Sequence, residues 1–140
     1  MNKDELKSRT KQFALRVMNL VDALPNSNKG RAIGNQLIRY GTAVGANYRA
    51  CCRSRSKAEF VAKIEEEADE SAFWMELIIE AELLKAQKVQ PLLAEAIELT
   101  KIMARSRISA STALTQNKLL VSERNSNAIS NRRSAIGNRQ

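Results

Sequence analysis

The chain has 140 residues, of which 44% are apolar, enough for one domain with its own core. It contains no histidine, which excludes the commonest general base and metal ligand, the Glu-x-x-His pairs of di-iron bundles and the Arg–His pair of helical-bundle ribonucleases. The formal charge of +8 is segregated: 12 basic and 3 acidic side chains lie in residues 1–57, 3 and 11 in residues 58–100, and 8 and 1 in residues 101–140.

The first predicted helix runs from about residue 4 to residue 24. Asn2 and Glu5 resemble a capping box at its start, and Pro25 ends it because the residue before a proline avoids the α region. A row of mostly apolar residues recurs at spacings of 3 and 4, which suits packing against other long helices: Leu6, Thr10, Phe13, Val17, Leu20 and Leu24.

The second predicted helix runs from about residue 31 to residue 52, after a polar turn at residues 25–30. Its seam of Ile33, Leu37, Tyr40, Val44, Asn47 and Cys51 has the same 4-3 rhythm. Beside the seam lie Gly34, Gly41 and Gly45, each of which costs about 1 kcal/mol of helix propensity relative to alanine. We favour close approach by another helix over a weak helix that packing rescues. Together with the segregated charges, the glycines also suggest close contacts between copies of the chain.

The third predicted helix runs from about residue 57 to residue 87, with Ser56 and Glu59 as a capping box. The fourth has Pro91 in its first turn and continues to about residue 107. Four long helices with short connections predict an all-α, antiparallel, up-down-up-down four-helix bundle over residues 1–108. Residues 109–140 are basic, rich in serine and asparagine and without a sustained period, which predicts a flexible tail. The alternative is a further helix in which Ile108, Leu114, Leu119 and Leu120 pack.

The sequence offers no chemistry of an enzyme. No nucleophile–base pair and no glycine-rich phosphate loop is visible, and the acidic run near residue 66 is typical of a solvated or salt-bridged helix face. We therefore expect no catalytic residues, no metal and no cofactor. Asn47 stands where the seam needs an apolar residue, which favours a structural hydrogen bond to the third helix over a ligand contact. Trp74 is interpreted as a packing or subunit contact.

Six cations remain without an assigned partner, Arg31, Arg39, Arg49, Arg53, Arg55 and Lys57, and all except Arg31 are candidates for one binding surface. They could pair with the acidic third helix, in the same chain or in a neighbouring copy. They could equally form a surface for RNA or DNA. Because aromatic residues are only 4% of the chain, such a surface would contact phosphates rather than stack on bases.

The segment from residue 30 to residue 84 resembles a known family, the bacterial proteins encoded in intervening sequences of large ribosomal RNA genes. The likeness rests on Gln36-Leu37-Ile38-Arg39, on "VGANYR" at residues 44–49, on "RSKAEF" at residues 55–60 and on "EEADESAFWMELI" in the third helix. It covers about residues 6–105. Cys51 and Cys52 depart from the small residues that are common there, without affecting the comparison.

The resemblance implies a fold and an assembly more than an activity. Members form antiparallel four-helix bundles that assemble as homopentamers, and no catalytic residues are known for them. The fold is similar to that of the basic accessory proteins of diversity-generating retroelements, which bind nucleic acid and a reverse transcriptase. We therefore expect a non-enzymatic homo-oligomer that binds RNA or DNA. The alternative is an accessory subunit whose partner is a protein such as a reverse transcriptase.

The location expected from the sequence is the cytoplasm. The first residues have no apolar core of a signal peptide, and no uncharged apolar stretch approaches 18 residues. The two cysteines are neighbours, and neighbours on a helix point in different directions, so no disulfide is expected between them.

Overall fold

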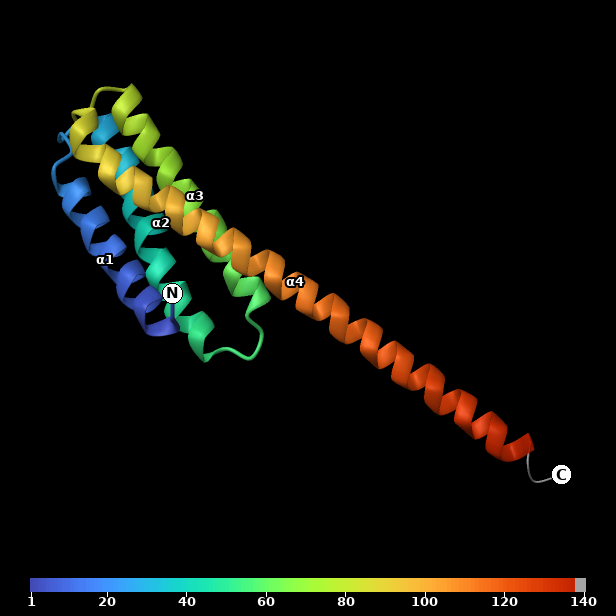
Figure 1. Ribbon diagram of the computed structural model, residues 1–140. Helices are drawn as coiled ribbons and strands as arrows, with labels where there is room; N and C mark the ends of the chain where they lie inside the picture. Colours follow the sequence, from blue (N-terminus) through green and yellow to red (C-terminus); the bar gives the residue numbers. More distant parts are fainter. Residues whose placement is uncertain (138–140) are drawn as a thin grey trace. The chain divides into compact units, whose positions relative to one another are not determined.

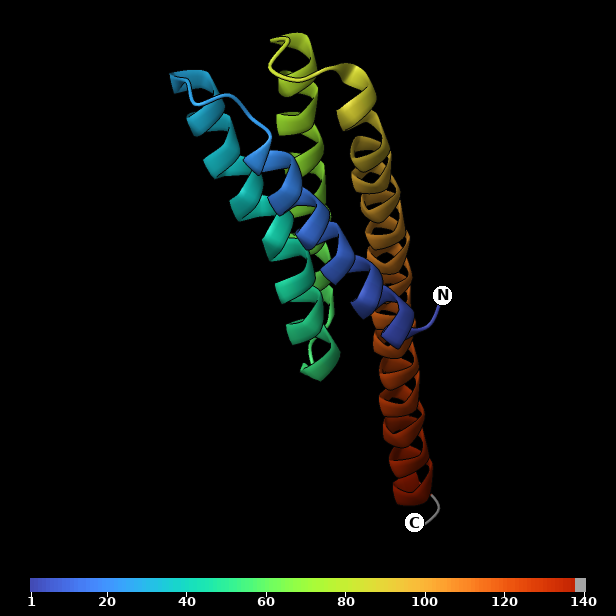
Figure 2. The ribbon, with the colours of Figure 1, turned by 90° about the vertical axis from the view of Figure 1, so that its left-hand side faces the viewer.

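The computed structural model describes residues 1–137, which form four helices: α1 (Lys3–Asp22), α2 (Asn28–Arg53), α3 (Ala58–Glu80) and α4 (Ala86–Gly137). The chain divides into two compact units, Met1–Arg107 and a second that begins at Ile108. In the first unit α1, α2, α3 and the beginning of α4 run alternately up and down (Figures 1 and 2). The predicted antiparallel four-helix bundle is confirmed for this unit.

The core of the bundle is built from one buried row on each helix. On α1 the row predicted from the sequence is buried as far as Leu20, and Thr10 satisfies its hydroxyl by donating to the carbonyl oxygen of Leu6 at 2.9 Å. The 3-4 spacing therefore identifies the inward face correctly. The largest side chains that are almost fully buried are Phe13, Leu37, Ile64, Met75, Ile78, Leu99 and Met103.

Three glycines of α2 let α1 approach closely. A Cβ atom at Gly41 would lie 2.7 Å from both methyl carbons of Val17, and one at Gly45 would lie 3.1 Å from the carbonyl oxygen of Thr10. At Gly34 the nearest atom would be Cγ1 of Val21, at 3.2 Å. The predicted close packing is confirmed, and its partner is a helix of the same chain.

The start of α1 agrees with the sequence, whereas the starts of the other three helices differ from it. Asn2 forms the predicted capping box with Glu5. The second helix begins at Asn28 rather than at residue 31, because Ser27 caps it by accepting from the N–H of Gly30. The capping box predicted at Ser56 is wrong: α3 has Lys57 as its N-cap without a side-chain hydrogen bond, and the N–H of Ser56 donates to Ser54 Oγ instead.

The third helix ends at Glu80, earlier than the predicted residue 87. Glu82 has a φ of 56° and donates its N–H to the carbonyl oxygen of Ile79, while the N–H of Leu83 donates to Ile78. This is a Schellman arrangement, in which a left-handed residue closes the last turn of a helix. Glycine usually occupies that position, so a glutamate there does not indicate the end of a helix.

Replacing Glu82 with glycine is expected to stabilise the bundle by about 1 kcal/mol, because glycine adopts the left-handed region without the steric cost that other residues bear. Urea denaturation followed by circular dichroism measures the change. The matched control is Glu76→Gly, at an exposed helical position, which should cost about 1 kcal/mol instead. A loss of stability in both variants would contradict the proposed end of α3.

Residues 108–137 are helical, which differs from the flexible tail predicted from residue 109. The segment contains no proline, and its only glycine is Gly137, so nothing in it breaks a helix. All of residues 111–137 are exposed. No side of this part of α4 is buried, which explains why its sequence lacks an apolar period.

Pro91 also lies inside α4 rather than in its first turn.

Candidate nucleic-acid interface

Three of the five predicted cations lie on one face of α2. Arg39, Arg49 and Arg53 are exposed, and with Thr42 and Ala46 between them they follow the 3-4 spacing that places residues in one row of a helix. Arg55 and Lys57 are exposed in the connection between α2 and α3. The structure therefore brings three of these residues onto one helix face and leaves two at its end.

These cations are not neutralised by the acidic residues of their own chain. Within residues 1–137 none of the five forms an ion pair; the pairs that bridge helices there are Arg9–Glu95 and Arg107–Glu65. The guanidinium carbon of Arg39 lies 5.6 Å from the centre of the Tyr40 ring, a cation–π contact that keeps the charge accessible. Balance within the molecule does not explain this basic cluster.

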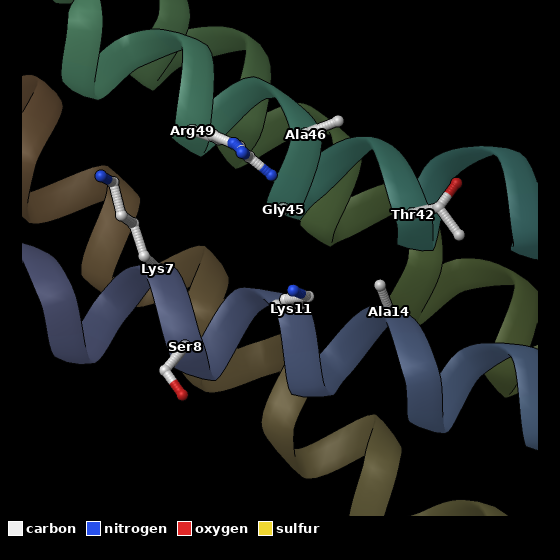
Figure 3. A pocket seen from close by; sticks show the side chains of 8 residues that line it. All are labelled: Lys7, Ser8, Lys11, Ala14, Thr42, Gly45, Ala46 and Arg49. Carbon is white, nitrogen blue, oxygen red and sulfur yellow. The ribbon is translucent and has the colours of Figure 1, made fainter.

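A groove of about 620 Å³ runs between α1 and α2 beside this face. Figure 3 shows Lys7 and Lys11 on α1, with Arg49 across the groove on α2. Its lining contains three cations and no carboxylate, so its potential is positive and suits a phosphate chain. The full lining is Lys7, Ser8, Lys11, Ala14, Thr42, Gly45, Ala46 and Arg49.

Lys7 and Lys11 were missed as candidates from the sequence. A signal for them was present, because they are four apart on the polar side of α1. The missing information was the pairing of α1 with α2. Gly45 approaches the backbone of Thr10, and this contact brings the turn that carries Lys7 and Lys11 next to Arg49.

Asn47 forms the hydrogen bond to the third helix that the sequence predicts. Its Nδ2 donates to both carboxylate oxygens of Glu67, at 2.7 and 2.9 Å. Glu67 is only 7% exposed. Burial, the largest cause, raises the pKa of Glu67, while the hydrogen bond from Asn47 acts in the opposite direction. Asn47 is a packing residue rather than part of the groove.

The aromatic pair on α3 lies away from the basic groove. The rings of Phe73 and Trp74 are 5.1 Å apart in an edge-on arrangement. Phe73 is 49% exposed, whereas Trp74 is half-buried, and its indole nitrogen is buried without a hydrogen-bond partner among the described residues. Trp74 therefore contributes to packing between α3 and its surroundings, as the sequence indicates.

Tyr48 and Cys51, next to the basic row, add no negative charge at neutral pH. Burial is the main cause that raises the pKa of Tyr48 to about 12, with a further contribution from the Cys52 side chain. Burial likewise raises the pKa of Cys51, so its thiol stays protonated at neutral pH. Both cysteines are free in the structure.

Among the other depressions of the described residues, the one between α1 and α4 also holds cations without a carboxylate, Arg16 and Lys88, but one cation fewer than the groove. Residues 1–137 contain no group of three or more cysteine or carboxylate side chains placed to hold a metal ion. Among the same residues no helix has the length and apolar character needed to cross a membrane. The groove between α1 and α2 is therefore the best candidate for a functional surface.

Two comparisons with known proteins give matches. The family model described as "23S rRNA-intervening sequence protein" matches residues 3–105. A crystal structure of a protein with unknown function, from the S23 ribosomal protein family of Bacteroides thetaiotaomicron, is similar with a TM-score of 0.66. The two sequences are 30% identical over 73% of this chain and 97% of that one. A comparison with curated proteins gives no match.

Proposed function

The chain belongs to the 23S rRNA-intervening sequence protein family, and we propose that it is a cytoplasmic, non-enzymatic bundle that binds RNA or DNA through phosphates. The observation that carries this proposal is the groove between α1 and α2, where Lys7, Lys11 and Arg49 meet without a carboxylate. Arg39, Arg53, Arg55 and Lys57 extend the positive surface along α2 and beyond its end.

Phosphate contacts rather than base contacts fit this surface. The groove lining contains no aromatic side chain on which a base could stack. Arg49 is its only guanidinium, and lysine ammonium groups act as point charges toward phosphates. We therefore propose binding that tolerates many sequences and weakens steeply with salt.

A second candidate function is that of a subunit with a protein partner, such as a reverse transcriptase. The observation that favours it is Phe73, which is half-exposed in the middle of the acidic face of α3. An exposed aromatic side chain of this kind is typical of a protein contact. The two candidates use different faces, so variants of the two faces distinguish them.

Replacing Lys7, Lys11 and Arg49 with alanine is expected to weaken binding to unrelated oligonucleotides by a similar factor for each. Each lost phosphate contact should also flatten the slope of log affinity against log salt by about 0.7 to 0.9. Fluorescence anisotropy with labelled oligo(dT) and oligo(U) over a salt series measures both effects.

The matched control for this experiment replaces three exposed lysines outside the groove, Lys29, Lys63 and Lys88, with alanine. It removes the same charge and should change the slope much less. Equal effects of the two triple variants would show that net charge, rather than the groove, determines binding. Wild-type protein that fails to bind either probe at low salt would refute the proposed function.

The family resemblance implies assembly into five copies, and we propose a homo-oligomer of that size. Light scattering coupled to size exclusion should then give about five times the chain mass of 15.6 kDa. A mass that remains that of one chain across the micromolar range would refute the assembly. This measurement is made without nucleic acid, so its outcome is independent of the binding experiment.

A further inference from the structure

The outer face of α3 carries an unpaired acidic row that is interrupted by one aromatic residue. Its members recur at spacings of 3 and 4 and are exposed, except for half-buried Ala62: Glu59, Ala62, Glu66, Asp69, Phe73, Glu76 and Glu80. Within residues 1–137 none of these carboxylates forms an ion pair. We call this row the acidic stripe.

The acidic stripe and the basic groove lie on opposite sides of the bundle. Helix α2 packs against both α1 and α3, and α4 is joined to α1 by Arg9–Glu95 and to α3 by Arg107–Glu65. Glu66 and Asp69 line a depression on the α3–α4 side, away from α1 and α2. A molecule therefore cannot bring its own stripe to its own groove.

The two surfaces match in charge, and the α1 row of Lys7, Lys11 and Ala14 that lines the groove continues beyond the groove to Met18 at the same 3-4 spacing. Lys11 and Met18 are seven residues apart on α1, as are Glu66 and Phe73 on α3, so each pair is separated by about 10 Å along its helix. Met18 is 45% and Phe73 49% exposed. An ionic contact and an apolar contact can therefore form together, and the apolar contact gives energy that exposed ion pairs alone do not supply.

We propose that the acidic stripe of one molecule docks in the basic groove of a second copy. Glu66 and Asp69 meet Lys7, Lys11 and Arg49, and Phe73 meets Met18. Because the two surfaces are different and lie on opposite sides, the contact is head-to-tail, the type that closes into a ring when the rotation permits. The groove then has two anionic occupants, the neighbouring stripe and, if the proposed function holds, nucleic acid. Self-association and phosphate binding compete.

Reversing the charge of the stripe tests this interface in the full chain. The variant Glu66→Lys with Asp69→Lys is expected to lose self-association, with a light-scattering mass near that of one chain. The control Glu98→Lys with Glu123→Lys makes the same change in net charge at exposed positions outside both surfaces, and it should keep the wild-type mass. An unchanged mass in the stripe variant overturns the proposal.

Reversing the charges of both surfaces, in two variants that are then mixed (a charge swap), distinguishes loss of the interface from loss of the fold. The groove variant Lys7→Glu with Lys11→Glu should also lose self-association. When it is mixed with the stripe variant, the lysines of one stripe face the glutamates of the other groove, and each remaining wild-type surface also finds its partner. The mixture is therefore expected to associate again, into species in which the two variants alternate; because five members cannot alternate around a ring, these species have an even number of chains or stay open. A mixture that stays at the mass of single chains overturns the proposal.

Competition gives a third readout that also distinguishes the two proposals. Titration of oligo(dT) should lower the proportion of wild-type oligomer, and the stripe variant should bind the probe more tightly than the control variant does. If the probe binds with no effect on the oligomer, the shared groove is refuted. If neither oligo(dT) nor oligo(U) binds while the charge swap restores assembly, the proposed interface is supported and the proposed nucleic-acid binding is refuted.

Discussion

Replacing Gly30 with alanine is expected to destabilise the bundle by about 2 kcal/mol or more, because the new Cβ has no room. It would overlap with the carbonyl oxygen of Pro25 and lie 3.2 Å from Oγ of Ser27. The first contact is with backbone, so the turn itself must move, and with it the cap that Ser27 provides to α2. The expected loss in the thermal midpoint is about 10 °C.

The control for this change is Gly137→Ala, where an added Cβ has no neighbour within 4 Å. It should leave the midpoint unchanged or raise it slightly, because alanine has the higher helix propensity. Thermal unfolding followed by circular dichroism measures both variants. If Gly30→Ala melts within a degree or two of the wild type, the turn between α1 and α2 has a different conformation.

The helices of the bundle could be predicted from the sequence because each has a buried row with regular spacing. The row from Leu6 to Leu20 and the capping box of Asn2 and Glu5 are local patterns, and both are present. The helix ends that were predicted wrongly depend on backbone geometry that residue types do not reveal. At Glu82 a non-glycine residue takes the left-handed conformation, and at Ser27 a short polar side chain starts α2 one turn early.

The candidate groove was only half predictable. The cations of α2 stand out because they cluster in the sequence, whereas Lys7 and Lys11 become relevant only when α1 lies beside α2. Gly34, Gly41 and Gly45 indicated a close neighbour, but their sequence did not say which helix or which copy supplied it. The glycines fix the contact within the chain, and this contact assembles the groove.

A flexible tail was favoured over a helix at residues 108–137 because this segment has no apolar period. Such a period arises when one side of a helix is buried, and here no side is. Apolar side chains such as Leu114, Leu119 and Ile129 are each more than half exposed. The absence of proline is compatible with a helix in this segment. It does not distinguish a helix from a polar, flexible tail.

Replacing Asn47 with alanine is expected to destabilise the bundle by about 2 kcal/mol at neutral pH. Glu67 is almost fully buried, and within residues 1–137 the side-chain amide of Asn47 is the hydrogen-bond donor to its carboxylate. Removing that donor leaves the Glu67 carboxylate buried away from water and without a hydrogen bond to replace its hydration. Asn35→Ala, at an exposed position on the same helix, is the control and should change stability by only a few tenths of a kcal/mol.

The cost of losing Asn47 should depend on pH in a direction set by Glu67. Its folded-state pKa is raised above the ordinary value of 4.5, so ionisation of Glu67 opposes folding, and this penalty is complete only above the folded pKa. Asn47 offsets part of it, and without Asn47 the pKa should rise further. The difference between wild type and Asn47→Ala is therefore expected to be largest near neutral pH and to shrink as the pH falls toward 4.5.

A double-mutant cycle isolates the interaction between these two side chains. If the carboxylate is the cause, Glu67→Gln should be stabilising or neutral at pH 7, because the neutral amide costs less to bury and can still accept from Asn47. Alanine at position 47 should then cost less in the Glu67→Gln background than in the wild type. Equal costs in both backgrounds, or a cost that does not fall with pH, would show that Asn47 acts through packing alone.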